Sequence, residues 1–331
     1  MPTKVLFIGG TGTISAACTE LAAAQGIELT LLNRGTSEQP VPAGVEVVRA
    51  DIREPESVKT ALAGRRFDCV VDWIAFTPEQ VQVDIDLFRD RCAQYVFISS
   101  ASIYRKPPGA MPVTESTFTA NPYWGYSRNK IACEELLIDA FRASGFPATI
   151  VRPSHTYDKR RFPWFGDWTV IDRMLKGKKV LVHGDGTSLW TLTHHADFAK
   201  GFNGLLGNAG AVGEIFHITS DEALTWNRIH EIYASILGVE AKIVHAPSDL
   251  MVHFNPDWEG PIFGDRGHAM VFDNSKIKRY VPGFAATIPY PRGAREILEY
   301  YCADKSRQTV YPKVDALFDK IIAAQERAME G

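Results

Sequence analysis

One feature limits the fold of this chain more than any other, a short apolar run that leads through a cluster of glycines into a helical stretch. The run covers 5–8, the cluster is Gly9-Gly10-Thr11-Gly12-Thr13-Ile14-Ser15, and the alanine-rich stretch continues to Gln25. Glycine permits positive φ in a tight turn and lets backbone amides approach a pyrophosphate, which the positive end of the helix dipole favours. Although a glycine turn alone could be only a tight loop, this order predicts a dinucleotide site.

Apolar runs and amphipathic stretches alternate through the first half of the chain. The predicted strands after the first are 27–32, 45–49, 69–73, 95–98 and 148–152, and the predicted helices include 56–63 and 77–91. Strands that alternate with helices favour a parallel sheet that is covered on both faces. The sequence therefore predicts an α/β fold with a Rossmann-like doubly wound parallel sheet, and a cofactor across the carboxyl ends of its strands.

The alternation loosens after residue 155, where aromatic residues become frequent and most of them are expected to pack within a cap. We predict an NAD(P)-binding Rossmann domain at 1–155, completed by about 196–219, and a smaller, interleaved C-terminal substrate-binding cap at 156–195 and 220–331. A helix should begin near Thr193-His194-His195-Ala196-Asp197, with Asp197 as its cap.

The segment after the second strand bears on the choice of cofactor. A Rossmann fold usually places an acidic residue there for the adenosine ribose, but this chain has Asn33 and Arg34. An arginine suits a 2′-phosphate, so we expect NADP or NAD, with NADP favoured. The alternative is that Arg34 is a solvated loop residue. Asp51, after the third strand, either accepts a hydrogen bond from the adenine amino group or caps the helix that follows.

Tyr126 and Lys130 lie four residues apart on a predicted helix and should share one face. A lysine beside a tyrosine favours the phenolate and lowers the tyrosine pKa, which suits a general acid/base for alcohol and carbonyl chemistry. The spacing alone is also typical of an ordinary amphipathic surface. Its setting after the 95–98 strand and the Ser99-Ser100-Ala101-Ser102 segment favours the catalytic interpretation.

These motifs, together with Ile103-Tyr104 and Val151-Arg152-Pro153, occur in an order that resembles the extended short-chain dehydrogenase/reductase superfamily, specifically its NAD-dependent epimerase/dehydratase family. The resemblance covers nearly the whole chain. It implies that Tyr126 is the acid/base, that Lys130 holds the nicotinamide ribose, and that Ser100, with Ser102 in reserve, binds the substrate oxygen. The implied cofactor-binding residues are Gly9, Gly10, Thr11, Gly12, Thr13, Ile14, Asn33, Arg34, Asp51, Ile52, Ala75, Ser99, Tyr126, Lys130 and Pro153.

Three departures from the sugar-nucleotide epimerase pattern bear on the substrate. Trp190 and Ile262 stand where those enzymes offer arginines to a nucleotide diphosphate, and His155 replaces an asparagine. Because a diphosphate needs charge-assisted donors, we expect a small sugar-like or aromatic substrate bound by His155 and Trp190. Trp190 would offer a flat face and a free indole N–H. The alternative is a nucleotide-sugar epimerase or dehydratase in which Trp190 packs beneath the cap and the phosphate meets Arg160, Arg161 or Arg266.

Charge and composition limit the partners of this protein. The net charge of −3 over 331 residues argues against nucleic acid, although Val71-Asp72-Trp73-Ile74-Ala75 and the Leu-Asn-Arg-Gly after the second strand resemble the plastid stem-loop RNA-binding branch of the superfamily. Five cysteines without C-x-x-C spacing suit a reducing, cytoplasmic location, and the histidines lack a metal-ligand spacing. We expect a small-molecule substrate, no metal and no membrane span, and leave a homodimer open.

Overall fold

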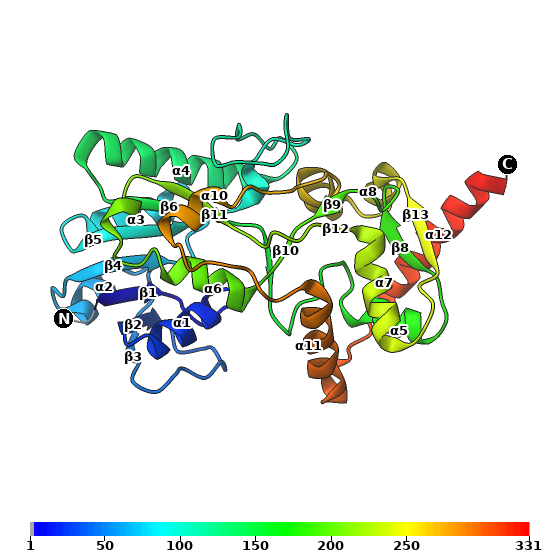
Figure 1. The fold of residues 1–331 in the computed structure, drawn as a ribbon, viewed down its shortest axis with the longest axis horizontal. Helices are drawn as coiled ribbons and strands as arrows, with labels where there is room; N and C mark the ends of the chain where they lie inside the picture. The colour runs from blue at the N-terminus through cyan, green and yellow to red at the C-terminus, as the bar shows by residue number, and fades with distance from the viewer. Residues whose placement is uncertain (1–2, 331) are drawn as a thin grey trace.

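The computed structural model describes residues 3–330, and a seven-stranded sheet forms its centre (Figure 1). Its strands are β1 (Lys4–Ile8), β2 (Glu28–Asn33), β3 (Glu46–Arg49), β4 (Phe67–Asp72), β5 (Cys92–Ile98), β6 (Ala148–Pro153) and β11 (Ile215–Ile218). Every neighbouring pair is parallel, in the order β11-β6-β5-β4-β1-β2-β3. This order confirms the predicted doubly wound sheet, and it reverses between β1 and β4, where such folds bind ligands.

Helices cover both faces of the sheet. One face packs against α1 (Ser15–Ala24), α6 (His195–Asn203) and α10 (Ser275–Tyr280), and the other against α2 (Pro55–Leu62), α3 (Pro78–Phe88) and α4 (Gly125–Ser144). In β1, Val5 and Phe7 point to the first group, whereas Leu6 and Ile8 point to the second. Successive strand residues face opposite sides, so a strand that is covered on both sides is apolar throughout.

A second body, at the right in Figure 1, is built mainly from the later part of the chain. Its helices are α5 (Trp168–Leu175), α7 (Trp226–Leu237), α8 (Ser248–Phe254), α9 (Glu259–Pro261), α11 (Tyr290–Cys302) and α12 (Pro312–Glu330). Its strands pair as β7 (His155–Tyr157) with β10 (Leu192–His194), β9 (Leu189–Trp190) with β12 (Leu224–Thr225), and β8 (Val180–His183) with β13 (Ile243–Ala246). We call this body the cap. Most of its aromatic rings pack into one core, as the sequence predicts.

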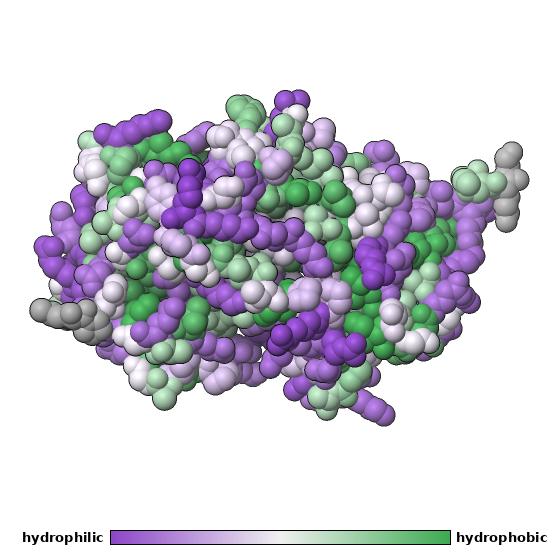
Figure 2. Space-filling view, viewed as in Figure 1, coloured by the Kyte–Doolittle hydropathy of each residue, from purple (hydrophilic) through white to green (hydrophobic). Residues whose placement is uncertain are grey.

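Short helical segments complete the fold. They are the 3-10 helices η1 (Ala101–Ile103), η2 (Ala209–Ala211), η3 (Pro256–Trp258) and η5 (Lys305–Arg307), and the π-helix η4 (Ile262–Arg266). On the face drawn in Figure 2, hydrophobic residues are interspersed among hydrophilic ones. No helix within residues 3–330 is long and apolar enough to cross a membrane.

The predicted cap of α6 is wrong. The helix begins at His195, and the Nδ1 of His194 accepts the backbone N–H of Ala196 at 3.2 Å. Asp197 lies inside the first turn, where its carboxylate accepts the N–H of Ile288 at 2.8 Å and pairs with Lys200. Asp197 therefore holds the returning chain against the helix instead of capping it.

Candidate active site

Two cavities lie near the carboxyl ends of the strands. The sheet cavity, about 580 Å³, lies among the turn after β1, the loops after β2 and β3, and the segment that joins β4 to α3. The cap cavity, about 620 Å³, lies among the first turn of α4, the segment after β6, and the cap. Both cavities occupy the place where the fold predicts a cofactor and a substrate.

The glycine turn has the geometry that a pyrophosphate site needs. Gly9 and Gly10 have φ values of +102° and +101°, and a Cβ on Gly10 would lie 2.7 Å from a Leu31 methyl group. Ser15, which replaces a third glycine, accepts the backbone N–H of Gly12 at 2.8 Å. The turn therefore brings bare backbone to the sheet cavity and suits a dinucleotide.

Arginines surround Asp51 at the outer end of the sheet cavity. Arg53 donates to both oxygens of Asp51, with Nε–Oδ1 at 3.0 Å and Nη2–Oδ2 at 2.6 Å. These hydrogen bonds, with the nearby charge of Arg34, hold the pKa of Asp51 at about 2. Asp51 does not cap α2, because Glu54 occupies the N-cap position. Sequence reasoning missed Arg53, although the Asp-x-Arg turn was a signal for it.

The structure separates the predicted cofactor residues into three groups. Those that line the sheet cavity are Gly9, Thr11, Asn33, Arg34, Asp51, Ile52 and Ala75. Those that line the cap cavity are Thr13, Ile14, Tyr126 and Pro153. Gly10, Gly12, Ser99 and Lys130 line neither cavity. The Ser99 hydroxyl is buried and has no hydrogen-bond partner within residues 3–330.

Tyr126 lies in the first turn of α4, half-buried, and lines the cap cavity together with Ser100. Burial raises the pKa of Tyr126, a hydrogen bond with Ser100 lowers it, and the charge of Asp265 raises it again. The net direction is upward, and Lys130 is not among the groups that shift this pKa, so the predicted lowering by Lys130 is not seen. The phenol is held in its protonated form, as a proton donor requires.

Lys130 lies beneath the two cavities and is only 2% exposed. Its Nζ donates to the backbone oxygens of Ala75 and Ile98, both at 2.7 Å. Burial lowers the pKa of Lys130 to about 8. An ammonium group has three donors, of which two join α4 to the segment after β4 and to the end of β5, and the third has no hydrogen-bond acceptor within residues 3–330.

Three serine hydroxyls form a chain beside Tyr126. Ser100 donates to the Oγ of Ser102 at 2.9 Å, and the Oγ atoms of Ser102 and Ser127 are 2.8 Å apart. Ser102 is buried whereas Ser100 is half-buried, so Ser100 is the hydroxyl better placed to meet a ligand. Sequence reasoning did not single out Ser127, which follows Tyr126 directly.

Trp190 does not offer a free face and N–H as predicted. It is 2% exposed, and its indole N–H donates to the Nδ1 of His155 at 3.1 Å. Burial and the charges of Arg266 and Arg161 lower the pKa of His155 to about 3. Ile262 is fully buried, so neither departure from the epimerase pattern places a cation in the cavity.

Other charged residues do line the cap cavity. They are Arg161, Asp167, Asp265 and Arg266. Arg160 instead pairs with Asp158, with Nε–Oδ2 at 2.7 Å. Burial raises the pKa of both Asp167 and Asp265. Within residues 3–330 neither carboxylate has a hydrogen-bond partner, so both remain available to a ligand. The sequence analysis named Arg161 and Arg266 as alternative contacts for a phosphate but did not identify Asp167 or Asp265.

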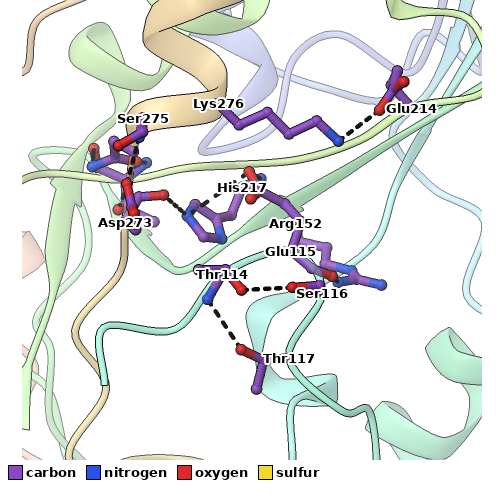
Figure 3. Close-up of polar contacts among 12 residues, drawn as sticks. Thr114, Glu115, Ser116, Thr117, Arg152, Glu214, His217, Asp273, Ser275 and Lys276 are labelled. Carbon is purple, nitrogen blue, oxygen red and sulfur yellow. Dashed lines mark hydrogen bonds and ion pairs between the residues drawn. The ribbon is translucent and has the colours of Figure 1, made fainter. Parts of the chain in front are cut away.

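A buried polar network supports the loop that carries the serines. Arg152, at the end of β6, donates through Nε to Glu134 of α4 at 2.9 Å and through Nη1 to the Tyr104 hydroxyl at 3.1 Å. The Tyr104 hydroxyl lies 3.3 Å from Nδ1 of His217. Figure 3 shows how His217 then joins Glu115 to the backbone of Asp273. The network links α4, β6, β11 and the chain that returns from the cap.

Comparison with known proteins places this site in a family. The family model described as NAD dependent epimerase/dehydratase family matches residues 5–219. That range includes the glycine turn, the serine segment, and Tyr126 with Lys130.

Individual relatives differ in their activities. A 2′-dehydrokanamycin reductase of Streptomyces kanamyceticus is 26% identical, over 85% of this chain and 80% of its own length. A chloroplast stem-loop binding protein of 41 kDa from Arabidopsis thaliana is also 26% identical, over 76% of this chain and 66% of its own. The solved structure of an epimerase from Methanothermobacter thermautotrophicus superimposes with a TM-score of 0.75 at 16% identity and covers 93% of this chain and 94% of that one. At that identity the likeness shows the fold alone.

Proposed function

The chain belongs to the NAD-dependent epimerase/dehydratase family, and from this membership we propose that it interconverts an alcohol and a ketone on a sugar-like substrate that carries no nucleotide. The observation that carries the proposal is the place of Tyr126 and Ser100, whose hydroxyls line the cap cavity at its border with the glycine turn. A nicotinamide cofactor bound along that turn would supply or accept the hydride. The protein's own residues handle the proton.

In the reductive direction Tyr126 donates its proton to the carbonyl oxygen, and in the oxidative direction it removes the proton from the hydroxyl. The raised pKa of Tyr126 supports the donor role at neutral pH. Ser100 would hold the same oxygen by turning its single O–H from Ser102 to the ligand, and Ser102 and Ser127 keep the Ser100 side chain in place through their hydroxyl chain. Lys130, anchored on two carbonyls, keeps one N–H for the ribose of the cofactor.

Replacing the proton donor tests this assignment. Tyr126→Phe should lower kcat by roughly two to four orders of magnitude, because the ring remains and only the hydroxyl is lost. Tyr123→Phe is the matched control, since Tyr123 is 41% exposed and outside the cavity lining. Isothermal titration should show that both variants bind the cofactor as the wild type does. Near-wild-type turnover by Tyr126→Phe would refute the mechanism.

For the cofactor we propose NADP over NAD. Arg34 and Arg53 both line the outer end of the sheet cavity, and the one carboxylate between them, Asp51, is already bound by Arg53. A 2′-phosphate therefore meets two guanidinium groups and a neutralised carboxylate. The ribose of NAD would find no free acceptor at the same place.

For the substrate, the buried Trp190 and Ile262 favour a ligand without a diphosphate. The relative named as a 2′-dehydrokanamycin reductase supports a substrate that is not a nucleotide-sugar, and its match covers 85% of this chain and so includes part of the cap. Arg161 and Arg266 in the cap cavity favour the competing nucleotide-sugar epimerase or dehydratase. A thermal-shift panel of UDP-sugars against free sugars and glycosides, each with NADP, separates the two. Strong stabilisation by micromolar UDP-sugar would overturn our preference.

The stem-loop binding relative makes RNA a second candidate ligand. The net charge of −3 opposes it, and a binding module would not need the assembled Tyr126, Ser100 and Lys130. Filter retention of a stem-loop RNA that falls steeply with added salt would favour RNA binding. We expect no such retention.

A further inference from the structure

Two residues that depart from the epimerase pattern, His155 and Trp190, contact each other. We propose that Trp190 fixes His155 as a neutral hydrogen-bond donor that binds an oxygen of the substrate and disfavours a cationic group. In this arrangement Trp190 is a positioning residue and His155 is the specificity residue. The inference deepens the proposed function and rests on it for the identity of the cavity as a substrate site.

The contact determines which nitrogen of the imidazole carries the proton. The indole N–H of Trp190 can only donate, and it points at Nδ1 of His155 at 3.1 Å. Nδ1 must therefore present its lone pair, and a neutral ring then carries its proton on Nε2. Trp190 is 2% exposed and packs against Trp226, with ring centroids 5.7 Å apart. Its N–H cannot turn away without repacking the core of the cap.

The ring also stays neutral. Burial disfavours the imidazolium, and so do the positive charges of Arg266 and Arg161. His155 lines the cap cavity and is half-buried. Within residues 3–330 its Nε2 has no hydrogen-bond partner, and Nε2 is not among the atoms sealed from solvent. An Nε2–H that is free and fixed in direction is therefore open to a ligand.

This donor discriminates by the kind of atom that it meets. A neutral N–H pairs with a hydroxyl, ether or carbonyl oxygen, and it repels an ammonium group, which has only donors. Where the epimerase pattern has a charged arginine, this pair offers a single neutral N–H, which carries no positive charge to attract a diphosphate but still binds a sugar oxygen.

Nitrogen NMR of histidine-labelled protein tests the tautomer without any catalysis. The wild type should show His155 with Nε2 protonated and Nδ1 unprotonated, unchanged from pH 8 to pH 5. Trp190→Phe keeps an aromatic ring but removes the N–H, so His155 should become a mixture of tautomers. A wild-type ring protonated on Nδ1, or one that titrates near pH 6.5, would overturn the proposal.

Two substitutions of His155 test the roles of its two ring nitrogens separately. The amide of His155→Gln reaches the place of Nε2, whereas the shorter amide of His155→Asn reaches only that of Nδ1. With NADP present, methyl glucoside is the neutral probe and methyl glucosaminide the cationic one. We expect methyl glucoside to bind more tightly than methyl glucosaminide, to shift the Nε2 signal, and to lose roughly tenfold in affinity, about 1.4 kcal/mol, with His155→Asn but little with His155→Gln.

Equal binding by the two variants, or no shift of Nε2 with any probe, would overturn the inference. The proposed function fails separately. If His155 has a fixed tautomer and a probe binds at its Nε2, but no ketone is turned over, the inference about His155 stands and the proposed oxidoreductase function is refuted. If a ketone is turned over normally while His155 is a mixture of tautomers, the proposed function stands and the inference about His155 is refuted.

Discussion

At the scale of the residue, Asp265 is a charge that acts on Tyr126, the proposed proton donor. Its carboxylate lines the cap cavity without a hydrogen-bond partner in the described chain, and its negative charge raises the pKa of Tyr126. The phenol must keep its proton to act as a donor. In the proposed mechanism, Asp265 therefore extends the pH range in which Tyr126 can donate its proton to a ketone oxygen.

Asp265→Asn should lower the pKa of Tyr126, because the substitution removes a nearby negative charge. In the reductive direction, the decline of kcat/KM at high pH should then begin at a lower pH than in the wild type. Asp185→Asn is a suitable control, since Asp185 lies on an exposed turn. An unchanged basic limb in Asp265→Asn would show that the carboxylate does not act on Tyr126.

The two arginines of the sheet cavity should differ in their effects. Arg34→Ala removes one donor to the 2′-phosphate and should weaken NADP by roughly tenfold, about 1.4 kcal/mol, with little effect on NAD. Arg53→Ala should weaken NADP further, because it also frees the Asp51 carboxylate to repel the phosphate. Isothermal titration with both cofactors measures this, with Arg89→Ala as the control, since Arg89 bonds the remote Ser144. NAD that binds the wild type tenfold more tightly than NADP would contradict the assignment.

Sequence reasoning identified candidate residues by their type and spacing, and it missed those that only tertiary contacts define. Tyr126, Lys130 and Ser100 were identifiable because their types and spacing belong to a known chemistry. Asp265 lies 139 residues after Tyr126 in the sequence, and no local sequence pattern shows that the two residues are close in space. The role of Trp190 was misjudged for the same reason, because its partner His155 belongs to another segment.

At the scale of the element, α4 is held by a buried ion pair. Arg152 and Glu134 have side chains that are only 4% and 5% exposed, and Nε–Oε1 is 2.9 Å. Glu134→Ala should destabilise the fold by about 3–5 kcal/mol, because it leaves a buried guanidinium without its partner. In the same helix, Asp139→Ala breaks a 3.7 Å pair that is mostly exposed and should cost less than about 1 kcal/mol.

Urea unfolding of the two variants compares these pairs directly. Similar midpoints for Glu134→Ala and Asp139→Ala would mean that the buried pair does not anchor the helix.

Elements were predictable in proportion to their length. The core strands show mostly apolar runs, and the predicted 56–63 helix lies within one residue of α2 at each end. Strands of two or three residues, such as β9 and β12, are too short to carry a period. They form because the cap brings them together. His194 was not expected as a cap because caps are usually hydroxyl, carboxylate or amide side chains.

At the scale of the whole molecule, the buried histidines make stability depend on pH. Burial lowers the pKa of both His183 and His230 to about 4, and they are 7% and 2% exposed. In the unfolded chain their pKa is near 6.5. Between these values the unfolded state binds more protons, so their contribution is present above about pH 6.5 and is lost as the pH falls towards 4.

Asp84 acts in the opposite direction, because burial and the nearby Asp72 raise its pKa. Its folded form takes up a proton before the unfolded chain does, which partly offsets the loss at low pH. The dependence of the free energy of unfolding on pH therefore sums contributions of opposite sign. Substituting one histidine isolates its own contribution.

His230→Gln removes one buried imidazole while keeping a polar side chain of similar length. Its free energy of unfolding should fall less steeply than that of the wild type between pH 6.5 and pH 4, by up to about 1.4 kcal/mol per pH unit for one proton. His253→Gln is the control, because His253 is exposed on α8, and its slope should match the wild type. Urea titrations at pH 7.5, 6 and 5 give the change in the free energy of unfolding with pH for the wild type and for each of the two variants. If the free energy of unfolding of His230→Gln falls on acidification as fast as that of the wild type, the pKa of His230 does not differ between the folded and unfolded states. Burial would then not lower the pKa of His230 in the folded protein.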